Sequence, residues 1–166
     1  MLRVGRRRTL IALALAPGVL RAQPGTIDSH LPPLGDVRAL ADSIARYKAP
    51  LLVLFSTPGC PFCREVRRNY LVPRVKEQAG KAIPELFLRE TDITSANAII
   101  DLAGTHLTES DFARRYGVRA VPVVTLFDAS LRAIGEPLIG LDRSGFYEGY
   151  LASAIDAARK HLRQTS

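Results

Sequence analysis

The two cysteines of this 166-residue chain, Cys60 and Cys63, lie three positions apart in the sequence Cys-Pro-Phe-Cys. Such a pair can carry out thiol-disulfide exchange, because the thiolate that attacks a disulfide forms a mixed disulfide that a neighbouring thiol then resolves. A disulfide that closes so short a loop contributes little stability, so a purely structural role is the weaker interpretation. The pair therefore indicates redox chemistry.

A metal site is a second interpretation of closely spaced cysteines, but zinc would need two further ligands. The three histidines, His30, His106 and His161, are scattered along the chain, and Met1 is its single methionine. A zinc or copper site is therefore disfavoured. We expect neither a metal nor an organic cofactor.

The residues around the cysteines predict the local structure that positions them. An apolar run over 51–55 indicates a strand covered on both faces, and the turn-forming sequence over 57–59 follows it. The next residues predict a helix over 60–70, which Pro73 must kink or end because proline lacks the N–H that a helix interior needs.

This arrangement places Cys60 at the start of a helix, where unpaired backbone N–H groups and the helix dipole favour a thiolate. Pro61 fits the first helical turn, and Cys63 follows one turn later on the same face. We therefore assign Cys60 as the candidate nucleophile and Cys63 as the candidate resolving cysteine.

Charged and aromatic side chains accompany the pair. Arg64 could further stabilise the thiolate, whereas Arg67 and Arg68 are expected on a solvated helix face. Phe62 is expected at the surface, where it either contacts a partner or packs against Pro58.

The rest of the chain predicts alternating helices and strands. Asp36 is a candidate cap for a helix that Pro50 stops, and Thr108 with Asp111 resembles a capping box. The segment 94–104 has mixed signals that suggest a short helix. The other expected elements are strands over 86–92, 121–127 and 131–140 and a C-terminal helix over 144–162. This order predicts an α/β sandwich on a small mixed sheet.

The first residues differ in composition from the rest. A basic stretch to Arg8, an apolar run over 10–20 and a cleavage site after Ala22 have the order of a secretory signal. The sequence also fits a loose twin-arginine signal, while the alternative, a buried N-terminal helix, conflicts with Pro17-Gly18. We expect a signal peptide over 1–22, a linker over 23–35 and a folded domain over 36–166.

The net charge of +7 is concentrated in this segment, because five of the 23 basic residues and none of the 16 acidic residues lie in the first 22 positions. The remainder is nearly balanced, so the charge does not predict a nucleic-acid partner. Export would place the cysteines in the periplasm, a compartment in which disulfides persist.

A second segment, over 116–127, adds to the evidence from the cysteine pair. The sequence Tyr-Gly-Val-Arg-Ala-Val-Pro-Val-Val-Thr-Leu-Phe over 116–127, together with the Cys-Pro-Phe-Cys segment after an apolar strand, resembles the thioredoxin family. The resemblance spans about residues 49–162 and implies a thioredoxin-like sandwich, a mixed central sheet flanked by helices. It also implies a cis Val121–Pro122 bond. The substrate-binding residues that it implies are Val121, Pro122, Pro61 and Phe62.

Three features depart from thioredoxin. Gly59 stands where the family usually has a tryptophan, and Leu54 stands where it has a buried aspartate that serves as a proton acceptor. Cys60 and Pro122 are 62 residues apart, which predicts an insertion over 92–109 before the cis-proline segment. The missing tryptophan and aspartate argue against a general cytosolic reductase. The export signal and the insertion together make the chain similar to periplasmic thioredoxin-like proteins, including those associated with bacterial sulfur oxidation.

The leading functional hypothesis is a monomeric periplasmic reductase that acts on the disulfide of a dedicated partner protein. It would require an electron donor, for which we expect a membrane thiol-disulfide carrier. The alternatives are an oxidase or isomerase of folding proteins, which would use the same two cysteines, and a non-catalytic binding module, in which the cysteines would be dispensable.

Overall fold

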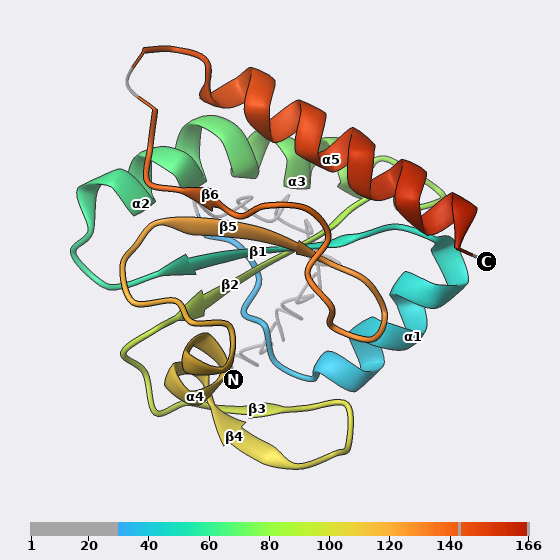
Figure 1. Cartoon of the computed structure of the whole chain (residues 1–166), viewed down its shortest axis with the longest axis horizontal. Helices are drawn as coiled ribbons and strands as arrows, with labels where there is room; N and C mark the ends of the chain where they lie inside the picture. Colours follow the sequence, from blue (N-terminus) through green and yellow to red (C-terminus); the bar gives the residue numbers. More distant parts are fainter. Residues whose placement is uncertain (1–29, 143, 166) are drawn as a thin grey trace, which may run out of the picture.

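The computed structural model describes residues 30–142 and 144–165, whose helices and strands are shown in Figure 1. The expected signal peptide and most of the expected linker lie outside these residues. Within the described part of the chain, no helix is both long and apolar enough to span a membrane.

A mixed four-stranded sheet forms the centre of the fold. Its strands are β1 (Leu51–Ser56), β2 (Phe87–Asp92), β5 (Val123–Phe127) and β6 (Leu138–Ile139), arranged in the order β2-β1-β5-β6. β2 runs parallel to β1, whereas β5 is antiparallel to both β1 and β6. All six residues of β1 are buried, as the apolar run predicted for a strand covered on both faces.

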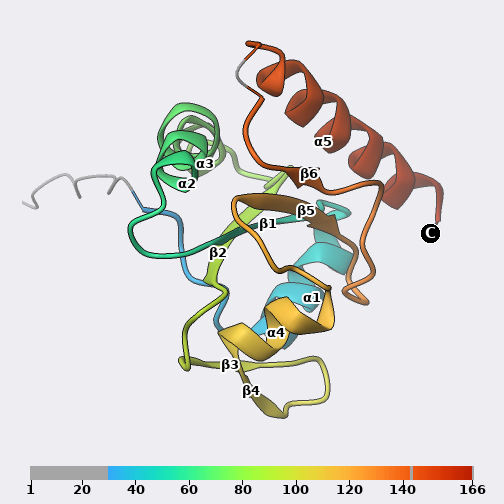
Figure 2. The ribbon, with the colours of Figure 1, turned by 60° about the vertical axis from the view of Figure 1, so that its left-hand side comes forward.

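Helices cover both faces of this sheet (Figure 1, Figure 2). One face carries α2 (Pro61–Val66), α3 (Val72–Ala79) and α5 (Tyr147–Gln164), and the other carries α1 (Val37–Tyr47) and α4 (Glu109–Arg115). Successive strand residues point to opposite faces, so Leu54 packs in the cluster of α5, and Phe55 packs in the cluster of α1. The predicted thioredoxin-like α/β sandwich is confirmed.

The helix that follows β1 continues beyond the expected end. A π-helical turn, η1 (Arg67–Leu71), joins α2 to α3, and Pro73 lies in the first turn of α3. Because Pro73 has no N–H, the α-helical bond to the carbonyl four residues earlier is absent in any case, and the wider π turn precedes it. The proline therefore coincides with an irregularity and does not end the helix.

The expected insertion over 92–109 forms a small second sheet. β3 (Ala98–Ile100) pairs antiparallel with β4 (His106–Thr108), so the helix expected within 94–104 is wrong. Asp101 makes the turn, because its Oδ1 accepts the backbone N–H groups of Ala103 and Thr105 at 2.9 Å each. α4 starts directly after β4, and its predicted capping box between Thr108 and Asp111 is confirmed.

The folded part of the chain begins earlier than the expected boundary at residue 36. Leu31 and Leu34 are buried, and Pro33 forms an isolated bridge with Glu90 of the edge strand β2. The Leu34 N–H donates to the Glu90 carbonyl, and the Glu90 N–H donates to the Pro32 carbonyl, both at 2.9 Å. Residues 31–34 thus cover the edge of the sheet and are not a linker.

The expected strand over 131–140 is also shorter than predicted. Residues 138 and 139 form β6, and Ala133 makes an isolated bridge with Phe127. Gly135 has a φ of +73°, and Pro137 has no N–H, so the segment between them cannot maintain a continuous ladder. The predicted edge position of this segment is confirmed.

Candidate active site

Cys60 and Cys63 form a disulfide at the start of α2, with their Cα atoms 5.3 Å apart. Cys60 is the N-cap residue, as predicted, and its Sγ accepts the backbone N–H of Cys63 at 3.1 Å. Pro61 occupies the first turn, where its missing N–H is not needed. After reduction, the N–H that faces the Cys60 sulfur would stabilise a thiolate at that position.

The two cysteines differ in exposure. Cys63 is completely buried, whereas Cys60 is partly exposed. Pro61 and Phe62, which lie between them, are exposed, and Phe62 retains 45% of its accessible surface. A partner protein can therefore reach Cys60 and the two intervening residues but not Cys63.

Val121 and Pro122 lie at the end of the sheet where β1 leads into α2. The Val121–Pro122 peptide bond is cis. Phe55 pairs with Val123 in the antiparallel register, and continuing that register by two residues places Val121 opposite Thr57, just before the cysteines. Val121 is half-buried and Pro122 is buried. The fold therefore brings all of the sequence-predicted site residues to one end of the sheet.

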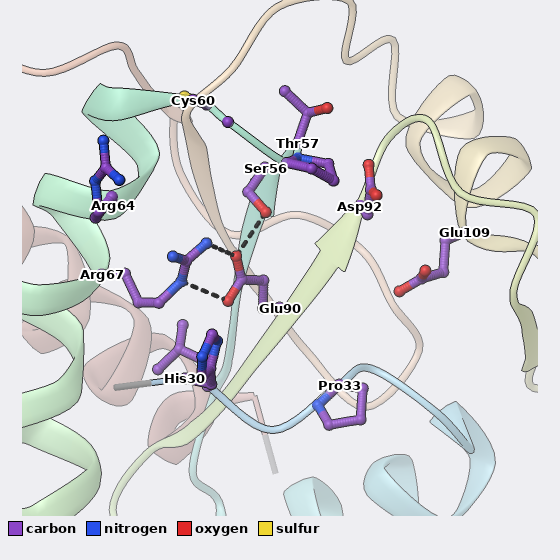
Figure 3. Close-up of a pocket in the computed structure, with 13 residues that line it drawn as sticks. His30, Pro33, Ser56, Thr57, Cys60, Arg64, Arg67, Glu90, Asp92 and Glu109 are labelled. Carbon is purple, nitrogen blue, oxygen red and sulfur yellow. Dashed lines mark hydrogen bonds and ion pairs between the residues drawn. The ribbon is translucent and has the colours of Figure 1, made fainter. Parts of the chain in front are cut away.

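A pocket of about 410 Å³ opens beside Cys60 (Figure 3). Its walls come from the turn before α2, from α2 and η1, from the end of β2, from the start of α4 and from the segment 30–33. Cys60 and Arg64 line this pocket, whereas Val121 and Phe62 do not. Of the sequence-predicted site residues, Cys60 is thus the one that borders this pocket.

Glu90 connects two walls of the pocket through hydrogen bonds. Its carboxylate accepts hydrogen bonds from the Arg67 guanidinium, through Nε at 2.8 Å and through Nη2, and from Ser56 Oγ at 2.6 Å (Figure 3). The Arg67 and Glu90 side chains are only 16% and 15% exposed. The expectation of a solvated Arg67 is therefore wrong, whereas Arg68 is exposed as expected.

Glu90 also clarifies the departure at Leu54. Leu54 is fully buried and pairs with Glu90 in the parallel register of β1 and β2. A carboxylate is therefore present beside the position of the missing aspartate, but on the neighbouring strand. It is engaged by Arg67, so it serves here to tie β2 to the helical segment that carries the cysteines.

Two further carboxylates line the pocket on the side of α4. Asp92 ends β2, and its Oδ1 accepts the Thr94 N–H at 2.9 Å and the Thr94 hydroxyl at 2.7 Å. Glu109 begins α4, and its carboxylate points away from that helix toward β2 (Figure 3). We call Asp92 and Glu109 the acidic wall.

Sequence reasoning did not identify Ser56, Glu90 or the acidic wall as site residues. The alternation of Leu88, Glu90 and Asp92 in one strand was a usable signal, because it places two acids on the same face as a core leucine. Glu109 gave no such signal, because an acidic residue in the first turn of a helix is ordinary. Within the described residues, no group of three or more His, Cys, Asp or Glu side chains is placed to hold a metal ion.

Comparisons with known proteins agree with this geometry. The chain matches the family described as Thioredoxin-like domain over residues 38–135, which is more than half of its length. This range includes the cysteine pair, the insertion and the Val121–Pro122 segment. No curated protein matches the sequence.

Solved structures include several thioredoxins with low sequence identity. Mitochondrial thioredoxin 3 from Saccharomyces cerevisiae, in its oxidised form, is 17% identical with a TM-score of 0.49, over 76% of this chain and 93% of that one. A mutant thioredoxin from Halobacterium salinarum is 19% identical with a TM-score of 0.45, over 78% and 96%. A thioredoxin-fold protein from Helicobacter pylori is 16% identical with a TM-score of 0.43, over 78% and 98%.

Proposed function

The chain belongs to the thioredoxin-like domain family, and on that premise we propose that it is a periplasmic thiol-disulfide oxidoreductase that reduces a disulfide of a dedicated partner protein. The observation that carries the proposal is the difference between the two cysteines. Cys60 is accessible and its sulfur accepts a backbone N–H, whereas Cys63 is buried one turn away. This asymmetry suits an attacking and a resolving thiol.

The reaction consists of two exchanges. The Cys60 thiolate attacks one sulfur of the partner disulfide, a Cys60–partner bond forms, and the other partner sulfur leaves as a thiolate that takes a proton from solvent. Cys63 then loses its proton and attacks Cys60 Sγ, which releases the first partner sulfur as a thiol and closes the Cys60–Cys63 disulfide. Two electrons thus pass from the dithiol to the partner.

The surfaces next to Cys60 provide the contacts for the partner. Val121 is half-buried just before β5 begins, where its backbone can pair with an extended segment that carries the disulfide. Pro61 and Phe62 are exposed between the cysteines, and Phe62 offers an apolar side chain to the same segment. Pro122 is buried, so it offers no surface to the partner.

The direction and location of the reaction rest on the sequence. A signal-like first segment supports export, and the departures at Gly59 and Leu54 support a dedicated reductase similar to those associated with bacterial sulfur oxidation. Because each turnover leaves the Cys60–Cys63 disulfide, the protein needs a donor of two electrons. A membrane thiol-disulfide carrier would supply them from the cytoplasm.

The decisive experiment traps the mixed disulfide. With Cys63→Ser, Cys60 can attack a partner but the complex cannot resolve, so we expect a covalent adduct in periplasmic extracts that a reductant releases and mass spectrometry identifies. The matched control is Cys60→Ser, in which the accessible thiol is missing and no adduct should form. An equal yield of adduct from both variants would contradict the assigned roles.

The reduction potential tests the direction of electron flow. A reductase is expected to have a potential below about −200 mV, whereas a value near about −120 mV belongs to strong periplasmic oxidants and would favour the oxidase alternative. A double Cys60→Ser/Cys63→Ser variant that retained full cellular activity would instead identify a binding module.

A further inference from the structure

The Glu109 carboxylate is buried without a cationic partner among the described residues. Its residue is only 7% exposed, and its two hydrogen bonds come from Thr91 Oγ1 and Asn97 Nδ2, each at 3.4 Å. Both distances exceed the usual ranges, which end near about 3.0 Å for hydroxyl donors and about 3.2 Å for nitrogen donors. A buried carboxylate with such weak compensation carries a desolvation cost that a cation in the pocket would offset.

Asp92 adds a second anionic group to the same wall. Both hydrogen bonds of Asp92 reach Oδ1, and Oδ2 accepts none from the residues that the structure describes. By contrast, most other acidic side chains of the described chain that are not fully exposed have an arginine or lysine partner, as Glu90 has Arg67 and Asp101 has Arg115. The acidic wall is thus the part of the pocket whose negative charge no arginine or lysine of the described residues neutralises.

The opposite side of the pocket carries Cys60. Figure 3 shows the cysteine and Arg64 on the α2 side, with Glu109 pointing inward from the α4 side. Arg67 lies on the same side as Arg64 and is already bound by Glu90, so it does not neutralise the acidic wall (Figure 3). A ligand that occupies the pocket of about 410 Å³ can therefore have one part at the reactive sulfur and a cationic part at Asp92 and Glu109.

We propose that Asp92 and Glu109 bind a lysine or arginine side chain of the substrate polypeptide, close in sequence to the disulfide that Cys60 attacks. The inference rests on the proposed function and names its substrate class. A bound metal ion is a poorer occupant, because no group of three or more ligating side chains is present in the described part of the chain. The substrate polypeptide is the better one, because Cys60, which it must reach, lines the same pocket.

The expected consequence is that Cys60 attacks a disulfide faster when a lysine or arginine lies close to it in the substrate sequence. A charge-assisted hydrogen bond to a carboxylate that has no arginine or lysine partner among the described residues stabilises the encounter complex and the mixed disulfide that follows. Substrates with a neutral residue in place of the cation would lose this contact, although the cysteine chemistry would remain the same. The acidic wall therefore determines specificity, and it takes no part in the bond-making steps.

The test uses the pre-reduced full chain and synthetic peptides. Each peptide has one cysteine in a disulfide with a neutral mercaptoethanol group, glutamine at the surrounding positions, and a single lysine moved through the three positions on either side. The second-order rate constant for oxidation of the chain is measured by acid quenching and mass spectrometry. We expect at least one lysine position to react about tenfold faster than the all-glutamine peptide.

Variants then test whether the faster reaction of the lysine peptide depends on the acidic wall. Glu109→Gln and Asp92→Asn should each reduce the lysine-to-glutamine rate ratio to about threefold or less, since each removes one charge and keeps the side-chain shape. The matched control, Glu77→Gln, removes an exposed carboxylate outside the pocket and should keep the native ratio. Having two variants keeps the test valid if one fails to fold.

Two results would overturn the inference and leave the proposed function intact. One is equal reactivity of the lysine and glutamine peptides with the native chain, and the other is a lysine preference that persists in both acidic-wall variants. Failure of the native chain to react with any peptide would instead overturn the proposed function, and the inference with it.

Discussion

Two buried carboxylates lie at opposite ends of the central sheet and differ in how they are compensated. Asp128 follows β5 at the end where β1 begins, and it accepts the N–H groups of Ser130 and Arg132 at 2.8 and 2.9 Å and Arg132 Nε at 3.0 Å. Glu109 lies at the Cys60 end with two bonds of 3.4 Å. The comparison separates a carboxylate that stabilises the fold from one whose bonding capacity is left for a ligand.

The largest expected effect on stability comes from removing the Asp128 carboxylate, whose hydrogen bonds are short. Asp128→Ala removes a buried carboxylate that accepts two backbone N–H groups of a part-buried turn and the Arg132 guanidinium, so we expect the free energy of unfolding to fall by about 3 kcal/mol. Urea denaturation measures this change. Asp142→Ala is the control, because Asp142 also accepts two backbone N–H groups but in an exposed turn. Equal losses in the two variants would show that burial of the Asp128 carboxylate contributes nothing to stability.

The next effect concerns the carboxylate that links the two parts of the pocket. Glu90→Gln leaves Arg67 without a charged partner at a largely buried position, and we expect a loss of about 2 kcal/mol. A double-mutant cycle with Arg67→Gln should show that most of this loss is a coupling between the two residues. The Lys81–Glu85 pair serves as a control, because both side chains are 40% exposed and water screens the interaction. A cycle for that pair should give a clearly smaller coupling energy. A larger coupling energy for Lys81–Glu85 than for Arg67–Glu90 would contradict the importance of burial at Arg67.

A smaller effect on stability is expected from neutralising Glu109, whose hydrogen bonds are long. Glu109→Gln removes a buried charge and also an anion in the first turn of α4, and these contributions oppose each other. The free energy of unfolding should therefore change by no more than about 0.5 kcal/mol. A loss as large as that of Asp128→Ala would mean that Glu109 is a structural residue and would remove the contrast on which the comparison depends.

The smallest effect concerns a buried polar group that has no charge. The Tyr147 hydroxyl has no hydrogen-bond partner among the described residues, so Tyr147→Phe should change the stability at neutral pH by less than about 0.5 kcal/mol. Thermal unfolding near neutral pH is the measurement. A clear loss would indicate a partner for the hydroxyl.

The same variant makes a prediction about pH. Burial raises the pKa of Tyr147 above its ordinary value. The folded chain therefore keeps its proton while the unfolded chain loses it, so native stability is complete below about pH 10 and falls as the pH rises further. Tyr147→Phe should show a shallower loss above about pH 10. Burial also raises the pKa of Tyr116, so the slope should decrease without disappearing.

Local features of the sequence predicted the cysteine helix well. The apolar run before Cys60, the proline after it and the capping pair Thr108 and Asp111 act over a few residues, and the structure has each of them in the expected place. The three-residue strands of the insertion were not predictable in this way, because their pairing depends on contacts with each other and on the bridge between Asp36 and Ile100.

Contacts between distant residues account for what the sequence did not show. Arg67 and Glu90 are 23 positions apart, and the arginine is indistinguishable by sequence from the exposed Arg68 beside it. The buried state of Glu109 depends on the positions of β2 and the insertion around it, which no local pattern specifies. The cysteine pair could thus be identified from the sequence, but the pocket beside it could not.

The segment 31–34 along β2 also has a consequence for solubility. An exposed edge strand offers unpaired backbone groups to other chains and is a common starting point for aggregation. Here Pro32 and Leu34 bind both backbone groups of Glu90, and the opposite outer strand, β6, has only two residues and follows Pro137. A protein whose proposed partners approach as extended polypeptides can therefore keep an open binding site at the end of its sheet while its two edges are short or partly covered, which limits fibril formation.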